Sequence, residues 1–171
     1  VEFLGLDYVF ASLLFEERYL ASRERFEARL NALQLNLGVF EQLREMARSF
    51  VDAAFSRVYP VLEQARLVGF SCSHYQLSGS LLLCAKIKEV SPNIRTVFGG
   101  KDCSGSFAGE LLANMATVDF VGIGECEVTI ESLLDHMEDN SKPLCNVVYR
   151  DGSGNPKDAP LKRNVSIKRL P

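Results

Sequence analysis

Apolar and polar residues alternate in two different ways along the chain, and the change comes near residue 66. Residues 1–66 repeat apolar side chains every three to four positions, which is the spacing of amphipathic helices. Residues 67–152 instead contain short, nearly continuous apolar runs between segments with helical spacing. The pattern predicts an N-terminal helical region followed by an α/β domain. Residues 153–171 are polar and contain prolines, and they are predicted to form a linker.

Three helices are predicted in the N-terminal region. The first lies within residues 4–20 and is expected to close at its charged end, and Ser22 is predicted to cap a second helix over 22–34. The third covers residues 39–65, and Pro60 is expected to kink or restart it because proline removes an internal hydrogen bond. No chemistry is visible in this region, which is interpreted as an interaction or covering layer.

The second region has the pattern of alternating strands and helices. Apolar runs predict strands at 67–73, 95–100 and 119–124, and helical spacing predicts helices at 77–90, 105–116 and 126–139. This order is typical of parallel strands covered on both faces, so we predict a three-layer, Rossmann-like (flavodoxin-like) α/β domain with a small parallel sheet. Right-handed crossovers would bring the three carboxyl ends of the strands to one edge. A hairpin around Asp151 and Gly152 is predicted to close the domain.

Composition narrows the class of protein. With 47% hydrophobic residues the chain is not disordered, and a formal net charge of −3 argues against a nucleic-acid partner. No apolar run is long enough for a membrane span, and the first residues lack the features of a signal peptide. The five widely spaced cysteines include no C-x-x-C pair, which argues against a disulfide framework and a structural zinc site. A cytoplasmic protein without a membrane partner is therefore expected.

Function is expected at the carboxyl edge of the predicted sheet, where open α/β sheets bind ligands. The loops there are SCSHYQLSG (71–79), GGKDCSG (99–105) and GIGECE (122–127). Glycine allows close backbone approach and serine donates hydrogen bonds, which suits a bulky ligand with phosphate or amide groups, although ordinary turns share this composition. A small flavin or nucleotide binder is disfavoured because no phosphate-loop motif occurs, and no catalytic or metal-ligating residues are assigned.

Two stretches carry a family resemblance. VGFSCSHYQLSGSLLLCAKIKEVSPNIRTVFGGKDCSG and the following VDFVGIGECEVTIESLL resemble the cobalamin-binding domain of cobalamin-dependent radical SAM enzymes. The similarity is greatest to the branch that matures ribosomally made peptides, with the anaerobic magnesium-protoporphyrin ester cyclase group as a relative. It covers Leu67 to about Gly152 and implies that this domain binds cobalamin, a cobalt cofactor.

The resemblance also implies which residues bind the cofactor. They are Ser71, Cys72, Ser73, Gln76, Leu77, Gly99, Gly100, Gly124 and Glu125. The first five match the loop that approaches the nucleotide tail of cobalamin, and the glycine pair matches backbone that lies against this tail. Gly124 and Glu125 match a G-E-x-E turn, in which Cys126 replaces the usual glycine and is expected to narrow the pocket or shift the turn.

Glu127 and Gly100 each carry a further expectation. Glu127 matches the same turn, but we expect it to stabilise the N-terminus of the following helix. If the dihedral angles of Gly100 suit other residues, replacing this glycine is expected to weaken cobalamin binding more than it lowers stability.

Other motifs of the family are missing. Without D-x-H-x-x-G, no protein histidine would lie beneath cobalt. Without C-x-x-x-C-x-x-C, an iron–sulfur cluster and S-adenosylmethionine would bind only in an absent radical SAM domain. We therefore expect a fragment of a methyltransferase or cyclase-like enzyme, not catalytic alone, whose partner is the radical SAM domain of the same parent chain. The fragment itself could be empty of cobalamin.

Two further expectations remain open beside this one. The alternative function is a flavodoxin-like protein-interaction or regulatory module without a cofactor. Its marks would be a loop edge filled by its own side chains and apolar surface on the N-terminal helices. The family domain normally begins with a strand–helix–strand unit, and no such unit precedes Leu6. Because a sheet without these strands would have an open edge and bare apolar surface, a homodimer that buries the N-terminal helices or this edge is also expected.

Overall fold

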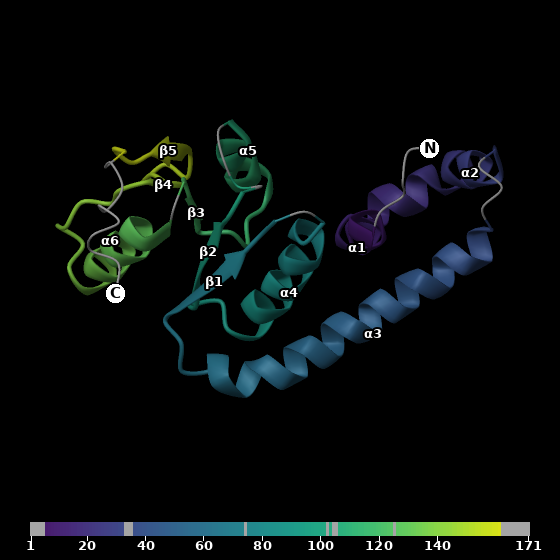
Figure 1. Cartoon of the computed structure of the whole chain (residues 1–171), viewed down its shortest axis with the longest axis horizontal. Helices are drawn as coiled ribbons and strands as arrows, with labels where there is room; N and C mark the ends of the chain where they lie inside the picture. The colour runs from purple at the N-terminus through teal and green to yellow at the C-terminus, as the bar shows by residue number, and fades with distance from the viewer. Residues whose placement is uncertain are drawn as a thin grey trace. The chain divides into compact units, whose positions relative to one another are not determined.

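The computed structural model describes residues 6–32, 36–73, 75–101, 103, 106–124 and 126–161. Their fold is α/β, as predicted, and its elements are shown in Figure 1. The chain divides into two compact units, and it passes between them three times. Unit 1 contains Val1–Gln64 and Tyr75–Ser91, and unit 2 contains Ala65–His74 and Pro92–Pro171.

Unit 1 is helical. Its helices are α1 (Leu6–Leu14), α2 (Glu16–Ala32), α3 (Leu37–Leu62) and α4 (Leu77–Val90). Aromatic side chains of α2 and α3 form much of its core, with the ring centroids of Phe26 and Phe40 lying 4.7 Å apart. Helix α4 packs against α1 and α3, and the Ser78 amide donates a 3.0 Å hydrogen bond to the Asp7 carboxylate at the start of α1.

The predicted start of the second helix is wrong, and one of the two outcomes expected at Pro60 does not occur. Helix α2 begins at Glu16, only one residue after α1, because Glu16 and Glu17 suit the positive end of a helix dipole. Ser22 therefore lies inside α2, where its hydroxyl donates to the Arg18 carbonyl at 2.8 Å instead of capping a helix. Pro60 does not restart α3, which continues through it to Leu62.

A charged cluster around the buried Arg44 connects α1, α2 and α3. The Arg44 guanidinium lies 2.8 Å from the Glu41 carboxylate and 3.1 Å from that of Glu16, and it sits 4.1 Å from the centre of the Tyr19 ring. The Tyr19 hydroxyl donates a 2.7 Å hydrogen bond to Glu41. Burial, followed by this hydrogen bond, raises the pKa of Tyr19 to about 12.

This pKa predicts that unit 1 loses stability as the pH rises from about 10 to about 12. The Tyr19 phenol has an ordinary pKa of 10.0 and ionises in the unfolded chain first, so the stability it contributes is full below pH 10 and falls above it. Urea denaturation followed by far-ultraviolet circular dichroism at several alkaline pH values measures the effect. The variant Tyr19→Phe should show a shallower fall; an identical pH dependence would contradict the prediction.

Unit 2 contains a five-stranded sheet in the order β1-β2-β3-β4-β5. The strands are β1 (Leu67–Ser71), β2 (Arg95–Gly99), β3 (Phe120–Gly122), β4 (Val147–Arg150) and β5 (Pro156–Asp158). Strands β1, β2 and β3 run parallel, as predicted, but β4 and β5 pair antiparallel. The predicted small parallel sheet is therefore one part of a mixed sheet, whose last two strands form the hairpin predicted around Asp151 and Gly152. Strand β5 lies inside residues 153–171, the segment predicted as a linker.

The direction of β4 follows from hydrogen bonds along α6 (Cys126–Glu138). Three α6 side chains bond in turn to the backbone of the segment 142–146: His136 to the Lys142 carbonyl, Ser132 to Cys145, and Thr129 to the Asn146 carbonyl. This segment therefore returns beside the helix to the carboxyl end of β3. From there β4 can only run antiparallel to β3, and Gly122 pairs with Val147.

Helices α6 and α5 (Ser106–Asn114) of unit 2 contact side chains on opposite faces of the sheet, as the alternation along β4 shows. Leu133 of α6 packs with Val97 and Val147 in one buried cluster. Arg150 points to the other side of β4 and donates to the Leu112 and Met115 carbonyls at the end of α5. Within the described residues no helix is long and apolar enough to cross a membrane.

Candidate binding cavity at the carboxyl edge of the sheet

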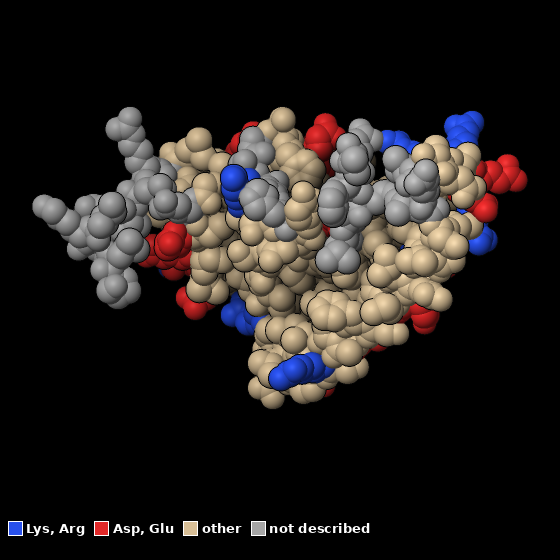
Figure 2. Space-filling view, turned by 45° about the vertical axis from the view of Figure 1, so that its right-hand side comes forward, with Lys and Arg blue, Asp and Glu red and all other residues tan. Residues whose placement is uncertain are grey.

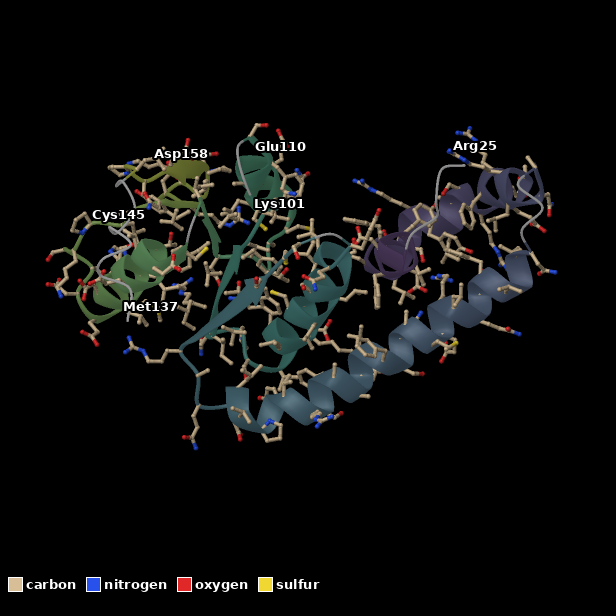
Figure 3. The ribbon with its side chains drawn as sticks, in the orientation of Figure 1. Arg25, Lys101, Glu110, Met137, Cys145 and Asp158 are labelled. Atoms are coloured by element: carbon tan, nitrogen blue, oxygen red, sulfur yellow. The ribbon has the colours of Figure 1, made fainter. Side chains whose placement is uncertain are left out.

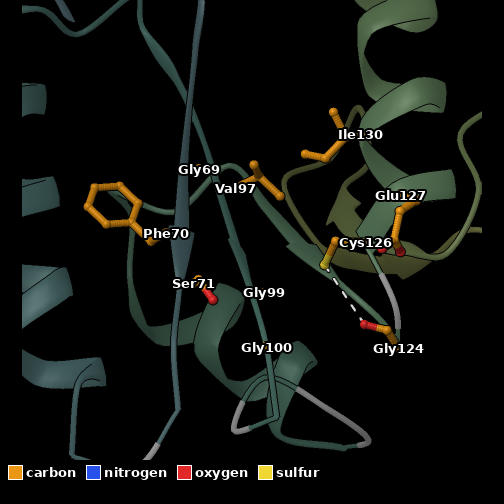
Figure 4. Close-up of a pocket in the computed structure, with 10 residues that line it drawn as sticks. All are labelled: Gly69, Phe70, Ser71, Val97, Gly99, Gly100, Gly124, Cys126, Glu127 and Ile130. Atoms are coloured by element: carbon orange, nitrogen blue, oxygen red, sulfur yellow. Dashed lines mark hydrogen bonds between the residues drawn. The ribbon is translucent and has the colours of Figure 1, made fainter. Parts of the chain in front are cut away.

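The carboxyl ends of β1, β2 and β3 meet at one edge of unit 2, and a cavity of about 410 Å³ opens there beside the start of α6 (Figure 4). Ten residues line it: Gly69, Phe70, Ser71, Val97, Gly99, Gly100, Gly124, Cys126, Glu127 and Ile130. They come from β1, β2, the loops after β2 and β3, and the first turns of α6. The cavity lies where the sequence predicts a ligand site.

The strand register builds the floor of the cavity. Gly69 pairs with Val97 and Ser71 pairs with Gly99, so these alternate residues share one face of the sheet. A Cβ added at Gly69 would meet only Val97, at 3.7 Å, so this glycine leaves free space above β1. The Phe70 ring points away from the cavity and stacks on Phe98, with ring centroids 4.6 Å apart (Figure 4).

Gly100 closes the end of the floor in a conformation that only glycine adopts easily. Its φ is +109°, and an added Cβ would collide with the Cys72 carbonyl oxygen and lie 3.0 Å from the Cys72 nitrogen. The Cys72 amide cannot move aside freely, because it donates a 2.7 Å hydrogen bond to the Gly99 carbonyl. The condition that the dihedral angles of Gly100 suit other residues is therefore not met, and replacing this glycine is expected to lower stability as well.

The Cys126 side chain fills a corner of the cavity. A Cβ added at Gly99 would lie 2.6 Å from its sulfur and one added at Gly122 would lie 3.0 Å from it, so the sulfur uses space that these glycines leave. The thiol lies 3.8 Å from the Gly124 carbonyl oxygen, to which it donates (Figure 4). Burial and the charge of Glu127 raise the pKa of Cys126 against an opposing hydrogen bond with the Gly100 backbone, so the thiol stays protonated at neutral pH.

The described lining of the cavity is acidic. Among its ten described residues Glu127 has the only carboxyl group, and none is basic. Lys101, labelled in Figure 3, follows the glycine pair but is not among these lining residues. Because a carboxylate repels phosphate, the cavity suits an uncharged flat group. Val97 and Ile130 offer such a group apolar contact, and the glycine backbones offer it hydrogen bonds.

The structure brings together part of the predicted set. Ser71, Gly99, Gly100 and Gly124 line the cavity. Cys72 is fully buried and Ser73 is exposed, and neither lines it. Gln76 and Leu77 belong to unit 1, where the Gln76 carbonyl accepts a hydrogen bond from the Ser80 amide at the start of α4. Glu125 falls outside the described residues.

Four lining residues escaped the sequence analysis: Gly69, Phe70, Val97 and Ile130. Three of them had a usable signal. Gly69 and Val97 lie two positions before Ser71 and Gly99, and strand alternation places such residues on one face. Ile130 lies four positions after Cys126, which is the same face of a helix. Glu127 lines the cavity and also lies in the first turn of α6, as expected.

The cavity carries no sign of metal ligation by the protein. In the part of the chain that the structure describes, no three His, Cys, Asp or Glu side chains gather closely enough to hold a metal ion.

No protein-family model matches this chain, and no curated protein matches it either. The loop residues and the cavity geometry are therefore the basis of any functional proposal.

Charge over the surface is scattered. Among the described residues in view in Figure 2, the Lys and Arg side chains lie apart from one another, with acidic and uncharged side chains between them. Several large apolar side chains remain exposed, and those of α3 are considered below.

Proposed function

We propose that unit 2 is a three-layer, Rossmann-like domain that binds cobalamin, as the accessory domain of a cobalamin-dependent radical SAM enzyme. The observation that supports this best is the cavity at the carboxyl edge of β1, β2 and β3. Ser71, Gly99, Gly100 and Gly124 line it, and the resemblance assigns these same residues to the cofactor. An iron–sulfur cluster and S-adenosylmethionine would belong to the radical SAM domain of the parent enzyme.

The cavity fits one part of cobalamin better than another. Its glycine floor and the apolar side chains of Val97 and Ile130 suit the flat aromatic base of the nucleotide tail. The carboxylate of Glu127, the acidic side chain among its described lining residues, does not suit the phosphate of that tail, which would lie outside the cavity. The fit therefore concerns the base.

The residues of the chain would bind and orient the cofactor. Bound cobalamin supplies alkyl transfer at its cobalt, and the protein supplies position. The Ser71 hydroxyl can donate a hydrogen bond to the base, while the protonated Cys126 thiol adds no charge to the floor. Gly69, above which the floor is open, lets the base approach the backbone of the sheet. No described lining residue has a partner arrangement for nucleophilic catalysis, so binding is the proposed role.

Equilibrium dialysis of the 171-residue chain against hydroxocobalamin tests the proposal. The sequence alone left open that the fragment could be empty, but the described lining of the cavity lies within unit 2 of this chain. We therefore expect retention of the corrin, with a visible spectrum that shows no protein imidazole on cobalt. Cobinamide, which has the corrin ring but no nucleotide tail, is the matched control and should bind at least ~10-fold more weakly. Absence of retention at a cobalamin concentration of about 1 mM would overturn the proposal, and so would equal affinity for the two corrins.

The cysteines support a cytoplasmic location as part of this proposal. All five are free thiols, and Cys72, Cys84, Cys103 and Cys145 are buried. Free thiols persist in reducing compartments, whereas small proteins of oxidising compartments often carry disulfides.

A protein-interaction module is the second candidate. One observation favours it, namely the exposed apolar side chains on α3 of unit 1, among them Val39, Met46 and Phe50. The cavity, which its own side chains do not fill, favours the first candidate. The two functions involve different units and are compatible.

A further inference from the structure

Helix α3 of unit 1 carries two apolar stripes, of which only one is covered. Phe40, Ala47 and Val51 are buried, together with the paired Arg44 between them. A second stripe, called the α3 stripe here, consists of Val39, Leu43, Met46 and Phe50, whose exposed fractions are 54%, 38%, 67% and 65%. Large apolar side chains exposed in a row mark surfaces that bind something.

The spacing of the α3 stripe points to another helix as its occupant. Its members follow one another at intervals of four, three and four residues, which is the heptad spacing of a coiled-coil seam. The intervals read the same in both directions. When a second α3 is turned antiparallel about an axis between Leu43 and Met46, Val39 meets Phe50 of that copy and Leu43 meets its Met46. The stripe is therefore complementary to itself.

Charge along the stripe agrees with a second copy. The residues that flank the outer side of the seam are Gln42 and Ser49, and the antiparallel arrangement places them near each other across the axis. Neither is charged, and their amide and hydroxyl groups can hydrogen-bond. Glu41 and Arg48 lie on another side of α3, where they bond within unit 1 to Arg44 and Glu16. No like charges would meet in the seam.

We propose that the α3 stripe is a self-association surface, on which a second copy of this chain packs its own α3 antiparallel about a two-fold axis. This inference stands apart from the proposed cobalamin site, which lies in unit 2. At the exposures given above, the four side chains of both copies bury about 900 Å² in total. Stable interfaces bury upwards of about 1,200 Å², so the dimer is weak, with a dissociation constant on the order of 10–100 µM.

Sedimentation equilibrium of the full chain from about 1 µM to about 500 µM tests the proposal. The wild-type chain should pass from monomer to dimer within this range. Met46→Glu should raise the dissociation constant at least ~10-fold, because the introduced carboxylate would face the apolar Leu43 side chain of the other copy. Val61→Glu is the matched control: Val61 is 78% exposed on the same helix but outside the stripe, and its variant should dimerise like the wild type. Circular dichroism would confirm that both variants keep their helices.

Mixing two variants tests the antiparallel register. Leu43→Lys and Met46→Glu should each dimerise poorly alone. Their mixture should associate at least ~10-fold more tightly than either, because the ammonium introduced in one copy would face the carboxylate introduced in the other. A parallel pair would place each position against itself, and the mixture would gain nothing. A monomeric wild-type chain, a dimer insensitive to Met46→Glu, or a mixture without gain would each overturn the proposal.

Discussion

Gly100→Ala is expected to destabilise unit 2 by about 3 kcal/mol or more, the largest effect of any substitution considered for this protein. A φ of +109° costs an L side chain energy in any surroundings, and here the added Cβ also collides with the Cys72 backbone. The collision is not relieved by a small shift, since the Cys72 amide is bonded to Gly99 across the ends of β1 and β2. Urea denaturation followed by circular dichroism measures the loss.

Gly124→Ala is the matched control for this prediction. Gly124 also has a positive φ, +75°, but an added Cβ would meet no atom within 4 Å. Only the backbone term remains, so the expected loss is about 1 kcal/mol. Equal losses in the two variants would show that the contact with Cys72 does not restrict residue 100.

Gly69→Leu is expected to weaken hydroxocobalamin binding at least ~10-fold while leaving stability unchanged or slightly higher. Gly69 is exposed on β1, and its first added atom would rest against Val97 at ordinary contact distance, so a leucine side chain extends into the cavity. Strands favour side chains over glycine, which offsets any local cost. Equilibrium dialysis and urea denaturation of the same preparation separate the two effects.

Two further glycine variants control this experiment. Gly69→Ala adds one carbon to the floor and should weaken binding less than Gly69→Leu. Gly109→Ala on α5, where an added Cβ meets open space, should stabilise the chain by about 0.5–1 kcal/mol and leave binding unchanged. If the chain retains cobalamin and Gly69→Leu binds it as tightly as wild type, the cofactor does not use this cavity.

Local patterns predicted the elements better than their directions. The helical spacing of 77–90 matches α4 as observed, and the segment 4–20 contains α1 together with the start of α2, because apolar periodicity is a local property of the chain. The antiparallel direction of β4 was not predictable in this way. It depends on hydrogen bonds of Thr129, Ser132 and His136 to residues that follow α6, and no periodicity reports such contacts.

The candidate site was predictable to a similar extent. Loop composition pointed to the loops at 71–79, 99–105 and 122–127, since the carboxyl ends of parallel strands share one edge. Within them the resemblance assigned Ser71, Gly99, Gly100 and Gly124. It also assigned Gln76 and Leu77, which the structure groups with the helices of unit 1. The position after β1 at which the chain passes into unit 1 depends on tertiary packing, which loop composition does not report. The resemblance left open whether Cys126 narrows the pocket or shifts the turn. The structure shows that its sulfur fills a corner of the cavity, which depends on the spacing between β2 and α6.

The route of the chain between β1 and β2 limits how this protein can be divided. The connection runs through α4, whose neighbours α1 and α3 belong to unit 1. The Ser78 amide donates a hydrogen bond to Asp7, and a Cβ added at Gly79 would lie 3.6 Å from the Phe10 ring. A cut near residue 66, where the residue pattern changes, would leave α4 without these neighbours. The two adjacent strands would then be joined by a long unsupported loop, whose closure costs entropy. Residues 67–171 are consequently not expected to keep the cavity at the carboxyl ends of these strands when they are transferred to another protein. An exchange at this boundary would separate α4, which connects β1 to β2, from the helices α1 and α3 that pack against it.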